Sequence, residues 1–260
     1  MDKGKLKRSG QVLAPSIFTV ANMVCGFYAL LAAHMGEYTS GGLAIIGGIV
    51  FDMLDGRVAR MVHGESVFGI EFDSLSDFLT FCVAPAYLVY ALLLKDYGVG
   101  GFIVAFVFAL CGGLRLARFN AVVHAGQGSK TQFQGLPTPA AAGFLASFII
   151  LYEIVELDKP ARTLSFVMDQ IPLVASFVPF VTLALAFLMV SNVPYPAGKK
   201  PDLLHPRNVK LMAGVALFLT FLYFYPQNAI FLLFLFYVLS GFTNLFMPDR
   251  TVAAAEQPKA

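Results

Sequence analysis

Long apolar segments recur along almost the whole chain, separated by short polar connections that are rich in glycine and proline. A helix needs about 20 predominantly apolar residues to cross the hydrocarbon core of a bilayer, and most of these segments approach that length. Glycine and proline between them indicate turns and helix ends. The pattern predicts eight membrane-spanning helices, near residues 13–34, 41–60, 72–95, 99–121, 138–156, 173–191, 208–225 and 228–246.

The composition supports this interpretation. Of the 260 residues, 58% are hydrophobic and 13% are charged, and the charged share is about half that of an ordinary soluble domain. The three cysteines lie inside apolar segments, so no disulfide framework is expected. A net charge of +2 gives no reason to expect a nucleic-acid partner. The predicted fold class is an all-α polytopic membrane protein.

The lysines and arginines predict how the chain is oriented. With the N-terminus inside, only Lys95, Lys159 and Arg162 of the 18 basic residues fall on the outer side. Cytoplasmic loops of membrane proteins carry an excess of Lys and Arg, so this bias supports both the span count and the orientation. We expect a multi-pass protein of the cell (inner) membrane with both termini in the cytoplasm.

The same pattern divides the chain into four parts. Residues 1–12 form a basic juxtamembrane segment suited to anionic lipid headgroups, and residues 13–191 form a core of six spans. Residues 192–248 contain a cytoplasmic loop and two additional spans, and residues 249–260 are a polar tail.

Four aspartates lie where the second predicted span ends and the third begins, on the cytoplasmic side: Asp52, Asp55, Asp73 and Asp77. Their spacings of three and four residues place each pair on one face of a helix. Carboxylates beside hydrocarbon are costly unless a cation or a donor compensates them. Mg²⁺ or Mn²⁺ prefers oxygen ligands, and two such ions suit displacement at phosphorus. The stretch therefore predicts a divalent-metal site.

Neighbouring residues fit phosphoryl-type chemistry. Gly56 leaves room for a ligand to approach the helix backbone, Ala59 is small, and Arg60 can hold a phosphate through its planar fork of donors. Such a transfer also needs a base for the attacking hydroxyl. Asp77, the deepest aspartate in the third span, is the candidate for that base.

Two other interpretations of the aspartates compete with a metal site. They could be helix caps or interfacial residues paired with Arg57 and Arg60, and Asp73 in particular could cap the third span. They could also line a proton or ion pathway, as in a transporter. Capping accounts for one aspartate at most, and a proton relay does not need glycine and arginine at fixed offsets. The residues therefore favour metal-assisted chemistry.

Residues 52–77 resemble the signature of the CDP-alcohol phosphatidyltransferase family. The chain reads D-x-x-D-G-x-x-A-R, then eight residues, then G-x-x-x-D-x-x-x-D, and every position of the signature is filled. The resemblance implies a six-span core, a polar cavity that faces the cytoplasm, two divalent cations and a homodimer. It further implies metal ligation by the four aspartates, with Asp77 also the general base, and CDP-lipid binding by Gly56, Ala59, Arg60 and Gly69.

Other segments point to one branch of the family. Residues 15–27, 114–120 and 133–139 are similar to those of membrane-embedded phosphatidylserine synthases, with weaker similarity at 191–196. This resemblance implies CDP-diacylglycerol as donor and L-serine as acceptor, with phosphatidylserine and CMP as products. Glycerol 3-phosphate or an inositol phosphate is the alternative acceptor, and either would favour a more basic pocket.

The acceptor site is expected outside the aspartate-rich stretch. Arg115 and Arg118 lie about one turn apart at the cytoplasmic end of the fourth span, where they could bind a carboxylate or a phosphate. Positive-inside anchoring explains the two arginines equally well. Asn120, Gln134 and Thr138 could supply further polar contacts to the acceptor.

Overall fold

The computed structural model describes residues 3–62, 67–124, 132–156, 164–196 and 209–246, and these residues are largely helical. Seven of the eight predicted spans coincide with one helix or one helical run, and the sixth is divided between two helices. The helices are α1 (Lys3–Met35), α2 (Tyr38–Val62), α3 (Val67–Asp77), α4 (Ala84–Val89), α5 (Val99–His124), α6 (Thr138–Glu156), α7 (Ser165–Met168), α8 (Ile171–Ser176), α9 (Val178–Val190), α10 (Val209–Phe224) and α11 (Pro226–Phe246).

The helices confirm an all-α polytopic membrane protein. Within the described part of the chain, four are long and apolar enough to cross a bilayer: Ile17–Met35, Phe68–Tyr97, Val99–Val122 and Thr138–Glu156. Shorter apolar helices cover Val178–Val190, Gly214–Phe224 and Pro226–Gly241. The predicted polar tail 249–260 and most of the loop 192–207 lie outside the described residues.

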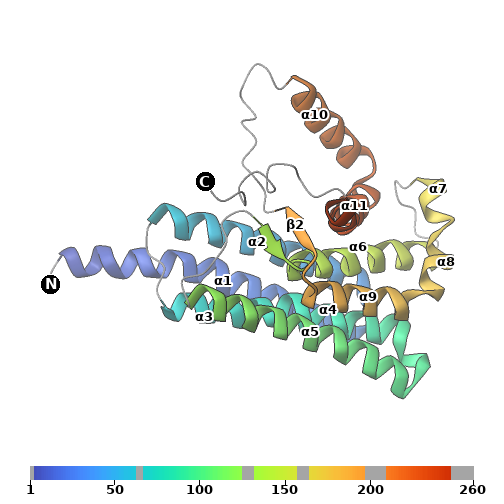
Figure 1. Ribbon diagram of the computed structural model, residues 1–260, viewed down its shortest axis with the longest axis horizontal. Helices are drawn as coiled ribbons and strands as arrows, with labels where there is room; N and C mark the ends of the chain where they lie inside the picture. The colour runs from blue at the N-terminus through green and yellow to red at the C-terminus, as the bar shows by residue number, and fades with distance from the viewer. Residues whose placement is uncertain (1–2, 63–66, 125–131, 157–163, 197–208, 247–260) are drawn as a thin grey trace, which may run out of the picture.

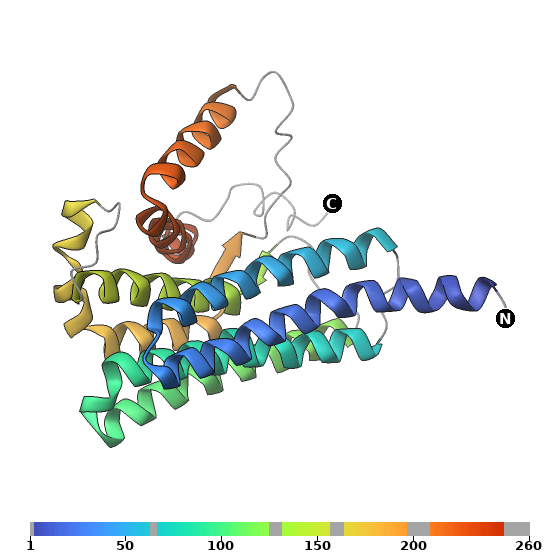
Figure 2. The ribbon, with the colours of Figure 1, turned by 180° about the vertical axis from the view of Figure 1, so that it is seen from behind.

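The long helices form one bundle around α6 (Figure 1). In α6, 83% of the membrane-spanning window is buried inside the protein, the largest share among the four candidate spans. α1 packs along α2 and α3, α2 packs on α6, and α5 packs on α9. Figure 2 shows α1 and α2 side by side on the opposite face, and in both views α10 stands apart from the bundle while α11 lies against it.

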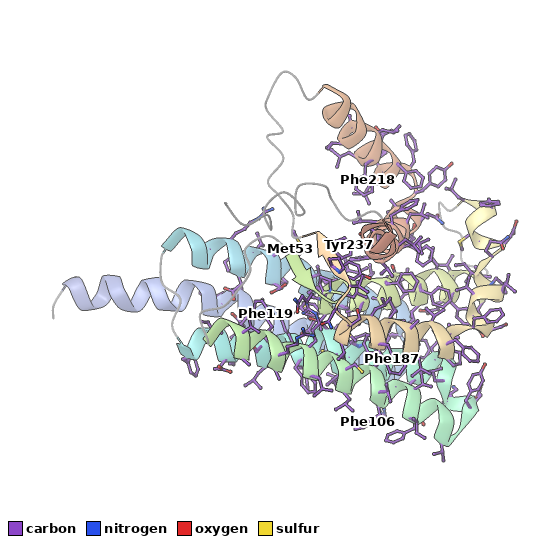
Figure 3. The ribbon with its side chains drawn as sticks, viewed as in Figure 1. Met53, Phe106, Phe119, Phe187, Phe218 and Tyr237 are labelled. Atoms are coloured by element: carbon purple, nitrogen blue, oxygen red, sulfur yellow. The ribbon has the colours of Figure 1, made fainter. Side chains whose placement is uncertain are left out.

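Large apolar side chains cover the outside of this bundle. Phe106 on α5 is 54% exposed and Phe187 on α9 is 64% exposed, and both project from the surface (Figure 3). Rings of this size on the outer face of long apolar helices are expected where the solvent is lipid rather than water.

The third predicted span is a single helical run that changes its hydrogen-bond pattern. After α3 it continues through the π-helix η1 (Phe78–Val83), α4, the π-helix η2 (Tyr90–Leu94) and the 3-10 turn η3 (Lys95–Tyr97). The Ala84 amide at the end of η1 donates to the Leu79 carbonyl, and the next residue, Pro85, has no amide hydrogen to donate. Such wide turns commonly occur at functional sites. Here η1 begins directly after Asp77.

The sixth predicted span, 173–191, was wrong as one continuous helix. The structure breaks it at Phe177 into α8 and α9. Pro179 stands in the first turn of α9, where a missing amide hydrogen costs little, but it could not have continued the hydrogen-bond ladder of α8. The sequence pattern showed the apolar run and missed this break.

A short antiparallel ribbon was not predicted. β1 (Gln132–Gln134) pairs with β2 (Pro194–Pro196), with Phe133 opposite Tyr195. Gly135 follows β1 with a φ of +79°, a conformation that favours glycine, and a Cβ there would lie 2.9 Å from the Ser191 carbonyl oxygen. The ribbon ties the segment before α6 to the segment after α9.

Glycines allow α1 and α2 to approach η1 closely. A Cβ at Gly26 would lie 2.8 Å from the Cα of Thr80, and one at Gly48 would lie 2.6 Å from the Cγ2 of Thr80. Thr80 is fully buried. Small residues at helix contacts let backbones approach in membrane proteins. The contacts of α1 and α2 with the helical run that carries Asp77 therefore depend on these glycines.

We predict that Gly26→Ala destabilises the protein by about 1–3 kcal/mol, because the added methyl group meets the backbone of Thr80 as well as its buried side chain. The midpoint of thermal unfolding in detergent, followed by loss of the monodisperse peak on size exclusion, measures the effect. Gly214→Ala is the matched control, because a Cβ there meets nothing within 4 Å. Equal midpoints for the two variants would contradict this account of the packing.

Candidate functional site

Three of the four predicted aspartates converge. Asp52 of α2 and Asp73 and Asp77 of α3 each offer a carboxylate oxygen, and these oxygens all lie within 4.8 Å of one another. All three side chains are half-buried, while Asp55, one turn beyond Asp52, is only 6% exposed. The predicted spacings therefore bring the two pairs to one place between α2 and α3.

Hydrogen bonds from α1 hold two of these carboxylates. The Thr19 hydroxyl donates to Oδ2 of Asp55 at 2.5 Å, and Nδ2 of Asn22 donates to Oδ1 of Asp77 at 3.0 Å. These two donors lie three residues apart on α1, so one helix face fixes one carboxylate from α2 and one from α3.

The polar contacts also run from the third span back to α1. The Ser76 hydroxyl donates to the Thr19 carbonyl at 3.0 Å, and the Thr80 hydroxyl donates to the Asn22 carbonyl at 2.9 Å. Ser76 and Thr80 are fully buried. Both α1 donors are therefore fixed at their backbones by the same helical run that carries Asp73 and Asp77.

Two carboxylate oxygens of the cluster are left without protein partners. Oδ1 of Asp55 and Oδ1 of Asp73 are buried and accept no hydrogen bond from any residue that the structure describes. An unpaired buried oxygen of an ionised group is costly. A divalent cation with oxygen ligands would satisfy these atoms and the clustered charge, so the donor set fits such an ion.

The structure argues against the capping alternative. Asp73 lies inside α3, six residues after its start at Val67, so it does not cap that helix. Asp77 interacts electrostatically with Arg115 of α5. Arg57 is exposed, and the side chain of Arg60 lies outside the described residues.

The remaining residues of the signature lie on the same two helices. Gly56 is half-buried on α2 directly after Asp55, and Gly69 is half-buried on α3 one turn before Asp73. Ala59 and Arg60 belong to the last turns of α2, and the structure describes their backbone only.

Arg115 lies beside the aspartate cluster. It is half-buried on α5, and its Nε is buried without a hydrogen-bond partner among the described residues. Its guanidinium interacts electrostatically with Asp77 and with Tyr237 of α11. Of the five residues predicted for the acceptor, Arg115 is the one that interacts with an aspartate of the cluster in the part of the chain that the structure describes.

Arg118 has a different environment. Its Nη2 donates to Oε1 of Gln134 at 2.5 Å and to Oδ1 of Asn192 at 2.9 Å. Gln134 belongs to β1, and Asn192 precedes β2 by two residues. The side chains of Arg118 and Gln134 thus bind each other and join α5 to the ribbon.

Asn120 also has protein partners. Its Nδ2 donates to the Ser74 hydroxyl at 2.9 Å and lies 3.5 Å from Oε2 of Glu71. These three residues line one end of a cavity of about 310 Å³ between α3 and α5, whose other walls are mainly apolar. Among the described residues, these contacts of Asn120 do not include an aspartate of the cluster. An acceptor role for Asn120 therefore stays a prediction.

Thr138 begins α6 and is 1% exposed. Its hydroxyl is buried and has no partner among the residues that the structure describes. A buried hydroxyl without a partner is uncommon in proteins and calls for an explanation. Thr138 thus resembles Arg115 in having unused hydrogen-bonding capacity.

Sequence reasoning did not assign three residues that support this site. Thr19 is one residue in an apolar run, and its link to Asp55 spans 36 positions, which no local pattern reveals. Tyr195 and Tyr237 stack with ring centroids 5.8 Å apart, and Tyr237 interacts electrostatically with Arg115. Burial raises the pKa of Tyr195 to about 12, so this hydroxyl stays neutral and donates to the Val238 carbonyl at 3.2 Å.

Comparison with known proteins agrees with the signature. Residues 12–190 match the model of the CDP-alcohol phosphatidyltransferase family. A CDP-diacylglycerol–serine O-phosphatidyltransferase of Helicobacter pylori is 32% identical over 88% of this chain and 89% of its own length. A Bacillus subtilis protein of the same name is 32% identical over 72% of this chain and 91% of its own.

An archaetidylserine synthase of Methanothermobacter thermautotrophicus is 31% identical over 71% of this chain and 70% of its own length. The family match covers more than half of the chain and includes the whole aspartate cluster together with the α1 residues that bind it. The chain therefore belongs to the CDP-alcohol phosphatidyltransferase family.

Proposed function

We propose that this protein transfers the phosphatidyl group of CDP-diacylglycerol to the hydroxyl of L-serine, giving phosphatidylserine and CMP. The observation that carries the proposal is the cluster of Asp52, Asp73 and Asp77 within 4.8 Å, at the signature positions of the family. The choice of serine is supported by the relatives from Helicobacter and Bacillus, which are named for that acceptor.

Asp52, Asp55, Asp73 and Asp77 would hold two divalent cations, Mg²⁺ or Mn²⁺. When bound, such ions neutralise the charge of the diphosphate and of the leaving CMP. The unpartnered oxygens of Asp55 and Asp73 support this assignment. The hydrogen bonds from Thr19 and Asn22 would hold the ligands in a fixed orientation.

Asp77 would act as the general base. Its carboxylate takes the proton of the serine hydroxyl while the hydroxyl oxygen bonds to the phosphorus next to diacylglycerol. The bond from that phosphorus to the CMP oxygen breaks, and CMP leaves with the electron pair. The Asn22 amide on Oδ1 orients the carboxylate for this step. Gly56, Ala59, Arg60 and Gly69 would contact the CDP-lipid.

The acceptor would bind between the aspartates and α5. Arg115 is the proposed partner of the serine carboxylate, because it faces Asp77 and its Nε is unpaired. The unused hydroxyl of Thr138 is a second candidate contact. Arg118 and Gln134 would act indirectly, since they bind each other and hold the ribbon. One facing guanidinium suits a carboxylate better than the dianionic phosphate of glycerol 3-phosphate.

We further propose that residues 13–191 are the catalytic core, as the family match over residues 12–190 supports. The distribution of lysine and arginine supports an active site that opens to the cytoplasm from the inner membrane. A homodimer remains a prediction from the family resemblance.

Two other functions give different results in the same assay. Transfer to glycerol 3-phosphate or to an inositol phosphate uses the same cluster with another acceptor. A transporter would use the aspartates as an ion site and would release no CMP. The archaeal relative named for archaetidylserine raises a further variant, in which the lipid carries ether-linked chains.

The first prediction concerns the acceptor. Purified protein given CDP-diacylglycerol should release CMP with L-serine, and should release at most a trace with glycerol 3-phosphate or inositol phosphate. The measurement is CMP formation with lipid products separated by thin-layer chromatography. If CMP is released only with another acceptor, that acceptor takes the place of serine in the proposal. If CMP is released with none of the three, the result favours the transporter.

The second prediction concerns metal. EDTA should abolish CMP release, and Mg²⁺ or Mn²⁺ in excess of the chelator should restore it, because the clustered carboxylates need cations to approach a diphosphate. The same ions should raise the thermal unfolding midpoint of the protein in detergent. Undiminished activity after exhaustive chelation and dialysis would remove the metals from the proposal.

The third prediction concerns the base. Asp77→Asn should lower turnover on the order of 100-fold to 10,000-fold, while CDP-diacylglycerol still binds, because the amide keeps a ligand oxygen but accepts no proton. Turnover is read from CMP release, and binding from protection against thermal unfolding. Asp96→Asn is the control, an exposed aspartate at the far end of the same helical run. Normal turnover of Asp77→Asn would refute the assignment.

A further inference from the structure

The C-terminal helix α11 reaches the proposed acceptor site although it lies beyond the part of the chain that matches the family. The match ends at residue 190, and α11 begins at Pro226. α11 packs on α6 and on β2. Tyr237 of α11 interacts electrostatically with Arg115, which in turn interacts with Asp77. The guanidinium therefore interacts both with an aspartate of the cluster and with a phenol.

The ring of Tyr237 is held by Tyr195. The two rings are stacked at 5.8 Å with an angle of 26° between their planes, and Figure 3 shows Tyr237 beside α11 and β2. Tyr195 is fully buried, and its hydroxyl bonds to the carbonyl of Val238, the residue after Tyr237. A Cβ at Gly241 would lie 2.6 Å from Cε1 of Tyr195, so the glycine makes room for that ring.

Tyr195 is itself fixed to the catalytic core. It pairs with Phe133 across the ribbon, and the Arg118 guanidinium bonds to residues on both sides of the ribbon. The Gly135 amide donates to the Val193 carbonyl at 3.0 Å, and the Leu136 amide donates to the Leu188 carbonyl at 2.9 Å. A continuous set of contacts thus runs from α5 through the ribbon to Tyr237.

Packing alone does not require a tyrosine at position 237. Phenylalanine could supply the stacked ring equally well. It is abundant in this chain, and Phe234 and Phe236 precede Tyr237 closely in the sequence. The hydroxyl adds a hydrogen-bond donor next to a guanidinium whose Nε is unpaired. A neutral O–H donor beside a guanidinium is suited to a carboxylate, which accepts from both.

We propose that Tyr237 of α11 completes the acceptor site by donating a hydrogen bond, together with Arg115, to the carboxylate of serine. The inference rests on the proposed function and extends it, because it assigns acceptor specificity to a residue outside the matched family region. In the same arrangement Tyr195 is a positioning residue, since its hydroxyl is occupied by the Val238 carbonyl and its ring holds that of Tyr237.

The test compares serine with ethanolamine, which has the hydroxyl and the ammonium group of serine and no carboxylate. Tyr237→Phe keeps the ring and removes the donor. It should raise the KM for serine about tenfold, as expected for one lost hydrogen bond to a charged group, while the KM for CDP-diacylglycerol stays at the value of the unaltered protein. The ratio of kcat/KM for serine over that for ethanolamine should fall by the same factor, because only the carboxylate contact is lost.

Two further variants separate recognition from packing. Tyr223→Phe, a 73% exposed tyrosine on the neighbouring α10, should leave both KM values unchanged. Tyr195→Phe should lower the unfolding midpoint and leave the ratio between serine and ethanolamine unchanged, because its hydroxyl bonds to a carbonyl rather than to the acceptor. If Tyr195→Phe shifts that ratio as far as Tyr237→Phe does, the effect comes from packing and the inference fails.

The outcomes also distinguish this inference from the proposed function. If the unaltered protein releases no CMP with serine, the proposed function fails before any variant is compared. If it uses serine and Tyr237→Phe has an unchanged KM for serine, only the role of Tyr237 fails. A parallel loss of affinity for both substrates would likewise overturn the role, because it would indicate a general disturbance of the site.

Discussion

Like charges that lie close together between membrane-spanning helices set the main constraint on this structure. Carboxylate oxygens of Asp52, Asp73 and Asp77 within 4.8 Å repel one another, and each pair of full charges costs about 3.5 kcal/mol or more at an effective dielectric constant near 20. Helices α2 and α3 would relieve that repulsion by moving apart. The protein counters this tendency with α1, whose Thr19 and Asn22 donate to one carboxylate on each helix.

This bracing explains the surrounding packing. Close contact of α1 and α2 with the third span requires glycine at position 26 of α1 and position 48 of α2, because the buried Thr80 occupies the space in which a Cβ would lie. Thr80 then uses its hydroxyl on the Asn22 carbonyl, so the glycine contact and the hydrogen bond support the same donor. The π-helix that begins after Asp77 belongs to this contact, since Thr80 is one of its residues. Tight packing here therefore serves the charged site as well as the stability of the bundle.

The sequence predicted those features that depend on local pattern. The eight apolar runs located the helices because burial in lipid requires continuous hydrophobicity, and the spacing within residues 52–77 placed Asp52, Asp55, Asp73 and Asp77 correctly on two helix faces. The sequence pattern failed at Phe177, where hydrogen bonding overrides hydrophobicity. There Pro179 stands in the first turn of a new helix inside an unbroken apolar run. Contacts between distant segments could not be predicted either. The bond from Thr19 to Asp55 and the stack of Tyr195 on Tyr237 join residues with no periodic relation.

The two halves of the proposed site differ in the same respect, because one depends on a local sequence pattern and the other on contacts between distant segments. The part that handles the CDP-lipid depends on a compact signature on two adjacent helices, and that signature lies inside the matched family region. The proposed acceptor side is assembled from α5, the start of α6, the ribbon and α11, which are brought together only by tertiary contacts. An acceptor that differs in charge or size needs different donors but the same attack at phosphorus. Placing those donors on elements outside the signature allows the acceptor to be chosen without disturbing the carboxylates, whose spacing the bracing by α1 already fixes.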